Sequence, residues 1–118
     1  MSELQREEML YDVVIVGAGP AGLATAIKLK QVNKDLSVCL LEKAAEVGAH
    51  ILSGNVFETK ALDELIPNWE SLDAPVNTKV SSEDFLFLSK DKSLKIPNFL
   101  LPRSLQNHGN YIISLSNL

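Results

Sequence analysis

Residues 11–42 read YDVVIVGAGPAGLATAIKLKQVNKDLSVCLLE, and this stretch determines the fold class. Residues 13–16 form an unbroken run of Val and Ile, which is typical of a parallel strand buried on both faces. Residues 20 to about 31 have a helix-forming composition, residues 33–35 suit a turn, and residues 36–41 form a second apolar strand. The stretch therefore predicts strand, helix and strand, with Glu42 at the carboxyl end of the second strand.

Three glycines, Gly17, Gly19 and Gly22, join the first strand to the helix in the pattern G-x-G-x-x-G. The first permits a tight turn, the second lets the backbone approach a pyrophosphate, and the third lets the helix lie close to the strand. The N-terminus of the helix offers free N–H groups and a positive dipole end, which suit a diphosphate. This pattern indicates a dinucleotide site.

Glu42 strengthens that interpretation because it follows Gly22 by about 20 positions, where an acid accepts hydrogen bonds from ribose hydroxyls. A plain tight turn would explain the glycines but not Glu42. An exposed acid at a strand end would explain Glu42 alone. The order of all the parts within one short stretch favours the dinucleotide site over either simpler interpretation.

Composition limits the class of protein. The 118 residues amount to about one small domain. A net charge of −4 and a pI near 5.1 argue against a nucleic-acid partner. Cys39 lies mid-strand, where a buried small hydrophobe is a better interpretation than a redox centre. Residues 1–10 carry both charge signs without an apolar segment, so we expect neither a secretory signal nor a transit peptide. No apolar stretch is long enough to span a membrane.

A loop is predicted after Glu42, over residues 43–55. Small residues recur in it at Gly48, Ala49, Ser53 and Gly54. An ordinary flexible loop would account for them, but we favour a second close approach to the ligand, since loops at the carboxyl ends of strands hold the ligand in such sheets. His50 could contact the ligand or form a hydrogen bond within the loop, and we assign it no catalytic role.

An amphipathic helix is predicted over residues 56–72. Its apolar stripe includes Phe57, Leu62, Ile66 and Trp69, and Pro67 should end the regular helix at about residue 65 or 66. The stripe could pack on the core, or Phe57 and Trp69 could enter a membrane surface. The polar face of this helix is acidic, which is the wrong charge for anionic lipid.

Residues 71–82 suit a connecting segment, and short strands are predicted in residues 83–118. Residues 85–88 and 94–96 suit a hairpin, and residues 111–114 a final strand. His108 could border a ligand pocket, although a surface turn explains it nearly as well.

The expected fold is α/β: a Rossmann-like βαβ unit at 11–42 with an amphipathic helix and a small hairpin. Because a further parallel strand beside the first is needed, we expect an incomplete domain from a larger protein.

The sequence also carries a family likeness. YDVVIVGAGPAGLATAIKL and LLEKAAEVGAHILSGNVFE resemble the flavoproteins with two dinucleotide-binding domains, whose N-terminal fingerprint binds FAD. EKAAEVGAHILSGNVFETKALDELIPNW, APVNTKV and NHGNYIISL resemble the electron-transfer flavoprotein:ubiquinone oxidoreductase family more narrowly. The likeness runs from Tyr11 to Leu118. Many flavoproteins have two glycines where this chain has Gly48 and Ala49, so GAH supports the narrower match.

This resemblance implies roles for particular residues. The FAD pyrophosphate would be held by Gly17, Ala18, Gly19, Pro20, Ala21 and Gly22. Glu42, with Lys43 beside it, would hold the adenosine ribose. The loop along the cofactor toward the flavin would comprise Gly48, Ala49, His50, Ser53 and Gly54. No residue of this chain is expected to be catalytic or to bind a metal.

The resemblance also implies partners that lie outside the chain. The family passes electrons from reduced electron-transfer flavoprotein through FAD and a 4Fe–4S cluster to ubiquinone, on one face of an inner membrane. That likeness favours the membrane-surface interpretation of residues 56–72. A 4Fe–4S cluster needs four cysteines and this chain has one, so we expect it to be inactive alone.

We expect the cytoplasmic face of a bacterial inner membrane, with the mitochondrial matrix face as the second possibility. Two further hypotheses for the function stay open beside the quinone oxidoreductase. The chain could be a fragment of a related flavoprotein reductase or dehydrogenase, or it could be a noncatalytic NAD- or ADP-binding module.

Overall fold

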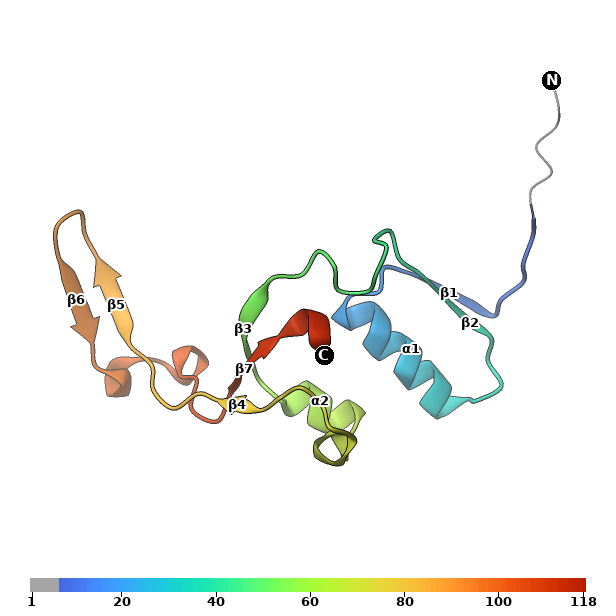
Figure 1. Ribbon diagram of the computed structural model, residues 1–118. Coiled ribbons are helices and arrows are strands. Elements are labelled where there is room, and N and C mark those ends of the chain that lie inside the picture. The colour runs from blue at the N-terminus through green and yellow to red at the C-terminus, as the bar shows by residue number, and fades with distance from the viewer. Residues whose placement is uncertain (1–6) are drawn as a thin grey trace, which may run out of the picture. The chain divides into compact units, whose positions relative to one another are not determined.

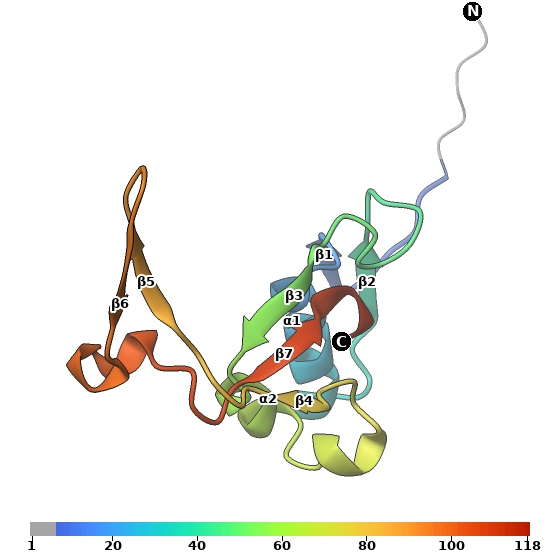
Figure 2. The same ribbon diagram turned by 60° about the vertical axis from the view of Figure 1, so that its left-hand side comes forward.

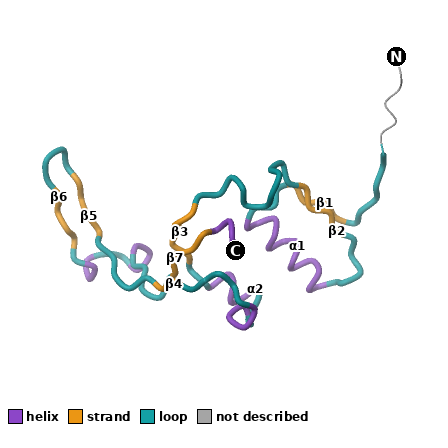
Figure 3. Tube along the Cα trace, viewed as in Figure 1, coloured by secondary structure: helices purple, strands orange, loops and turns teal. Residues whose placement is uncertain are grey.

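The computed structural model describes residues 7–118, which divide into two compact units. One unit ends at His50 and the other comprises Ile51–Leu118. Both units contain strands and helices, and loops connect them (Figures 1 and 3). Within the described residues, no helix combines the length and apolar composition required to cross a membrane.

The first unit is a strand–helix–strand motif. β1 (Val13–Val16) leads through the glycine turn into α1 (Pro20–Val32), and β2 (Val38–Leu41) pairs with β1 in parallel. The register places Val13 beside Val38 and Val16 beside Leu41. The sequence prediction of these three elements is confirmed, although the second strand begins two residues later than expected.

The expectation that the first strand is buried on both faces is wrong. Val13 and Ile15 are half-buried, whereas Val14 and Val16 are 53% and 83% exposed. The alternation arises because neighbouring side chains of a strand point to opposite faces, and α1 packs against β1 and β2 on one face. The other face of this two-stranded sheet leaves Val14 and Val16 in solvent.

Hydrogen bonds of the Asp12 carboxylate connect the amino-terminal ends of β1 and β2. Asp12 accepts hydrogen bonds from the backbone N–H and the Oγ of Ser37, both at 2.7 Å, and its own N–H donates to Ser37 Oγ at 2.9 Å. These bonds lower the pKa of the Asp12 carboxyl, because they favour its charged form. The pair sets the register of the strands at the end opposite Glu42.

The second unit is built on a three-stranded antiparallel sheet of order β3-β7-β4 (Figure 2). Its strands are β3 (Ser53–Phe57), β4 (Thr78–Lys79) and β7 (Tyr111–Ser114), and β3 carries a register irregularity between Ser53 and Asn55. β5 (Phe85–Leu88) and β6 (Ser93–Ile96) form a separate antiparallel hairpin. The predicted hairpin and final strand are confirmed; β4 lies in the segment that the sequence suggested was only a connection. The helical elements are α2 (Lys60–Leu65) and short 3-10 helices at Trp69–Leu72, Asn98–Leu100, Arg103–Leu105 and Leu115–Asn117.

The prediction of a single amphipathic helix over residues 56–72 is wrong. Val56 and Phe57 belong to β3, where they pair with Ile112 and Tyr111 of β7. Within residues 56–72, regular α-helix is confined to α2. It ends before Pro67 as predicted, because proline lacks the N–H that would continue the helix. Helical spacing misled the prediction, since Val and Phe at its start also favour a strand.

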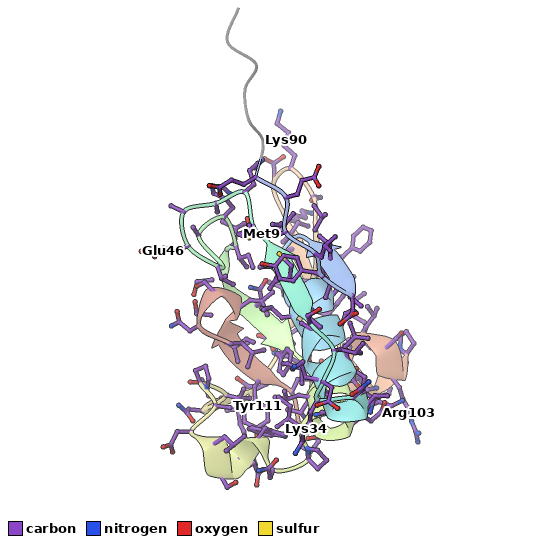
Figure 4. The ribbon with its side chains drawn as sticks, turned by 90° about the vertical axis from the view of Figure 1, so that its right-hand side faces the viewer. Met9, Lys34, Glu46, Lys90, Arg103 and Tyr111 are labelled. Carbon is purple, nitrogen blue, oxygen red and sulfur yellow. The ribbon has the colours of Figure 1, made fainter. Side chains whose placement is uncertain are left out.

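Trp69 and Phe57 lie in the core of the second unit. Trp69, Val76 and Ile113 are 7%, 4% and 4% exposed, and Phe57 packs against them. The Trp69 Nε1 donates to Asp63 at 2.7 Å, and its ring meets that of Tyr111, labelled in Figure 4, edge-on at 6.2 Å. This is the core-packing alternative, and it corrects the expectation that Phe57 and Trp69 enter a membrane surface.

Candidate functional site: a glycine turn beside an acidic strand end

The turn between β1 and α1 depends on two of its glycines for different reasons. Gly17 adopts φ +101°, a conformation that L side chains rarely adopt, and its N–H continues the strand pairing to the carbonyl of Leu41 at 2.7 Å. A Cβ at Gly22 would overlap the carbonyl oxygen of Gly17 and lie 3.3 Å from Cγ2 of Ile15. The predicted roles of these glycines in turning the chain and packing the helix are confirmed.

Gly19 is surrounded by open space. A Cβ built there meets no atom within 4 Å, and Gly19 has extended backbone at φ −76°, ψ 177°. No contact among residues 7–118 therefore requires glycine at this position. The sequence predicts that glycine is needed here because a ligand approaches the backbone, and this stays a prediction.

The N-terminus of α1 is arranged to receive an anion. Gly19 is the N-cap and makes no side-chain cap bond, Pro20 opens the helix, and the first turn contains no acidic residue. The N–H of Leu23 donates to the Gly19 carbonyl at 2.9 Å, so the N–H groups of Ala21 and Gly22 precede this first helical bond. Together with the helix dipole, they form an electropositive end without a competing carboxylate.

Glu42 lies at the carboxyl end of β2 and contacts the glycine turn directly. Its Oε2 accepts a hydrogen bond from the N–H of Ala18 at 2.9 Å, and its Oε1 accepts one from the N–H of Ala44 at 2.8 Å. The bond from Ala44 is the main cause that lowers the pKa of Glu42, followed by the bond from Ala18. The carboxylate is therefore kept charged beside the turn.

These contacts differ from the sequence prediction in one respect. Ala18 was expected to hold a pyrophosphate, but its N–H is taken by Glu42. Ala44 was not predicted at all. The only sequence signal for it is its position two residues after a strand-end acid, where a backbone N–H can reach back to the carboxylate.

The loop after Glu42 gives a mixed outcome. The backbone N–H of Lys43 and, to a smaller extent, His50 also contribute to the lowered pKa of Glu42. Gly48 has φ +82° and Ala49 donates to the carbonyl of Glu46 at 3.3 Å. Glu46 and Lys34 lie at opposite ends of the first unit (Figure 4), because the first follows β2 and the second precedes it.

Three more of the predicted positions lie in the second unit. Ser53 and Gly54 begin β3, and Gly54 has φ +80° at the irregularity of that strand. Their approach to a cofactor stays a prediction. His108 is exposed on a turn closed by the N–H of Asn110 and the carbonyl of Asn107 at 3.0 Å, which agrees with the surface-turn alternative.

The first unit fits the adenosine diphosphate half of a dinucleotide. An open backbone approach at Gly19, an electropositive helix end and a charged acid beside the turn match the diphosphate and ribose in turn. Among residues 7–118, His, Cys, Asp and Glu side chains do not gather in a group of three that could hold a metal ion.

Comparison with protein families matches residues 15–82 to the NAD(P)-binding Rossmann-like domain. The chain belongs to this family. The match includes the glycine turn, α1, β2 and Glu42, and it confirms the predicted Rossmann-like fold class.

Relatives share almost the whole chain. The electron transfer flavoprotein-ubiquinone oxidoreductase of Pseudomonas aeruginosa is 55% identical over 98% of this chain, and the mitochondrial one of Oryza sativa subsp. japonica is 58% identical over 96%. The chain spans 22% and 20% of the lengths of these proteins. The predicted resemblance is therefore confirmed, and the relatives include both bacterial and mitochondrial forms.

Proposed function

We propose that the chain is the FAD-binding N-terminal part of an oxidoreductase that passes electrons from reduced electron transfer flavoprotein to ubiquinone. The observation that carries the proposal is the glycine turn held beside the Glu42 carboxylate, in a chain 55% identical to a protein of that name. The two parts support different halves of the proposal. The turn supports a dinucleotide, and the relatives support its identity as FAD and the reaction of the whole protein.

Different residues would bind different parts of the cofactor. The N–H groups of Gly19, Ala21 and Gly22 would donate to the pyrophosphate, which lies where the helix dipole favours negative charge. Glu42 would accept hydrogen bonds from the ribose hydroxyls. The remaining loop positions that would follow the cofactor toward its flavin end are Lys43, Gly48, Ala49, His50, Ser53 and Gly54.

The chain itself would position the cofactor and perform no acid–base chemistry. The flavin supplies the electron transfer when it is bound. Gly17 and Gly22 would keep the turn in a fixed shape, and Ala18 would stay bound to Glu42 rather than donate to the pyrophosphate. The ligands of a 4Fe–4S cluster would come from other segments, because this chain contains one cysteine.

The partners of the full-length protein follow from the same proposal. Electron transfer flavoprotein would be the donor and ubiquinone the acceptor, at the surface of a bacterial inner membrane or on the matrix side of the mitochondrial one. We do not assign the membrane contact to Phe57 and Trp69, because both pack in the core of the second unit. The acidic charge of the chain gives no support for a nucleic-acid partner.

The experiment uses the full-length protein that carries this chain. Reduced electron transfer flavoprotein is mixed with it and with a soluble ubiquinone analogue, and reoxidation of the donor flavin is followed by absorbance. The proposal predicts quinone-dependent reoxidation that is lost in Gly19→Val. A rate of reoxidation that the added flavin-loaded wild-type protein does not raise above the rate without it would contradict the proposal.

A second candidate function is a noncatalytic NAD- or ADP-binding module, which the NAD(P)-binding family favours. Calorimetric titration of the flavin-free protein with FAD and with NAD separates the two. Tight binding of NAD with no binding of FAD would support the module and overturn the proposal.

A further inference from the structure

The carboxylate of Glu42 joins two segments of backbone that are far apart in the sequence. Oε2 accepts from Ala18, which lies 24 positions earlier in the glycine turn, and Oε1 accepts from Ala44 in the loop after β2. The last backbone pairing between the two strands is the bond from Gly17 to Leu41. Beyond that bond, Glu42 continues the connection between the turn and the end of β2.

The contact to Ala18 matters because Ala18 is buried. It is only 2% exposed, so its N–H depends on an acceptor within the protein. A charged acceptor gives a stronger hydrogen bond than a neutral one, and an unpaired buried N–H is costly. The position of the turn immediately before Gly19 is therefore coupled to the presence of this carboxylate.

The same carboxylate retains capacity for a ligand. An ionised carboxylate offers about four acceptor sites, and two of them are used by Ala18 and Ala44. The remaining sites suffice for two ribose hydroxyls. Ribose binding and turn positioning therefore need not compete for Glu42.

We propose that Glu42 is a positioning residue for the phosphate-binding turn, in addition to its contact with the ribose. The inference rests on the proposed dinucleotide site, and it assigns to Glu42 a second effect that acts through Ala18. Removing the carboxylate would then weaken the binding of phosphates even when the ligand has no ribose hydroxyl to contact.

The test compares two ligands that differ only in those hydroxyls. ADP and 2′,3′-dideoxy-ADP are titrated calorimetrically into the flavin-free, full-length protein, as wild type and as Glu42→Gln. A glutamine side chain has one acceptor oxygen, so it loses at least one of the two amide contacts. We expect the affinity for dideoxy-ADP to fall about tenfold, and that for ADP to fall further, from the usual strength of charged hydrogen bonds.

Hydrogen exchange gives an independent measurement without ligand. Peptides that contain Ala18 should exchange faster in Glu42→Gln than in the wild type, while peptides from the second unit should not change. Glu42→Ala, which removes both acceptors, serves the same two measurements if Glu42→Gln does not fold.

Asp12→Asn is the matched control. Asp12 also accepts backbone and hydroxyl bonds, but at the other end of the same two strands. It should leave both nucleotide affinities unchanged. Unchanged affinity for dideoxy-ADP in the Glu42 variants, with unchanged exchange at Ala18, would overturn the inference. Failure of the wild type to bind either nucleotide would instead refute the proposed dinucleotide site.

Discussion

At the scale of single residues, the three glycines of the turn have separable roles. Gly17 is required by its positive φ, and Gly22 by the carbonyl of Gly17, which occupies the place of a side chain. Both requirements come from the protein and could be predicted from the spacing of the motif. Among residues 7–118 Gly19 has neither constraint, and the proposed site assigns its requirement to the ligand.

This contrast predicts different outcomes for two substitutions in the full-length protein. Gly22→Val should destabilise the protein by about 1–3 kcal/mol or more, because overpacked side chains force the backbone to shift. Gly19→Val should abolish flavin retention, since a side chain there would occupy the approach of the pyrophosphate, and the unfolding midpoint of its flavin-free form should equal that of flavin-free wild type, because bound flavin would itself stabilise the wild type. Urea unfolding and flavin absorbance measure the two effects. A folded Gly19→Val protein with normal flavin content would refute the placement of the cofactor.

Glu42 predicts a dependence on pH. Its pKa is lowered from the ordinary 4.5 by the N–H groups of Ala44 and Ala18, so the unfolded chain binds a proton more readily than the folded one. The stabilisation is therefore fully present above pH 4.5 and is lost as pH falls through the lower folded-state pKa. Asp12 contributes in the same direction, from an ordinary pKa of 3.8.

The measurement is urea unfolding of the full-length protein as a function of pH, for wild type and Glu42→Gln. The difference in stability between the two should be constant from neutral pH to about 5 and should shrink below 4.5. A difference that grows as the pH falls would show that the sign is wrong.

At the scale of elements, local sequence predicted those segments whose partners are near in the chain. β1, α1 and β2 follow one another, and β5 and β6 face each other across a short turn. β3 and β4 were missed because their common partner is β7, which lies far along the chain. Helical spacing at residues 56–69 could not reveal that pairing.

β7 supplies a matched pair for testing the core. Ile113 is 4% exposed within the cluster around Trp69, whereas the neighbouring Ile112 is 38% exposed. Ile113→Ala should destabilise the second unit by roughly 2–5 kcal/mol. Ile112→Ala should cost much less, because its side chain already contacts water.

Hydrogen exchange of peptides from residues 51–118 in the full-length protein reports on the second unit directly. Equal losses of stability in the two isoleucine variants would contradict the assignment of the core.

At the scale of the whole molecule, the sequence identified the kind of site but not its internal contacts. Glycine spacing and a strand-end acid suffice to predict a dinucleotide, because those features recur wherever this unit binds one. The bond between Glu42 and Ala18 could not be predicted. The two residues are 24 positions apart, and they meet only because the folded chain brings the end of β2 to the turn. The contributions of Ser53 and Gly54 remain predictions, because they belong to the second unit.

The division into two units also limits what this chain does by itself. The first unit provides the glycine turn and Glu42, and the second provides its own core and a hairpin with exposed Phe87, Leu88 and Leu94. The chain spans 22% and 20% of the lengths of the two relatives described above. Cofactor binding, electron transfer and membrane contact are therefore properties to be measured on the full-length protein.

The proposed cofactor site is tested most directly by the identity of the nucleotide released when the purified full-length protein is denatured. Chromatography and absorbance distinguish FAD, NAD and ADP, and protein concentration gives the stoichiometry. The glycine turn and Glu42 predict one bound dinucleotide per chain in the wild type, and the likeness to the relatives predicts that it is FAD. Protein that is folded but contains no flavin, and that binds NAD instead when FAD is supplied in excess, would contradict the assignment of FAD to this site.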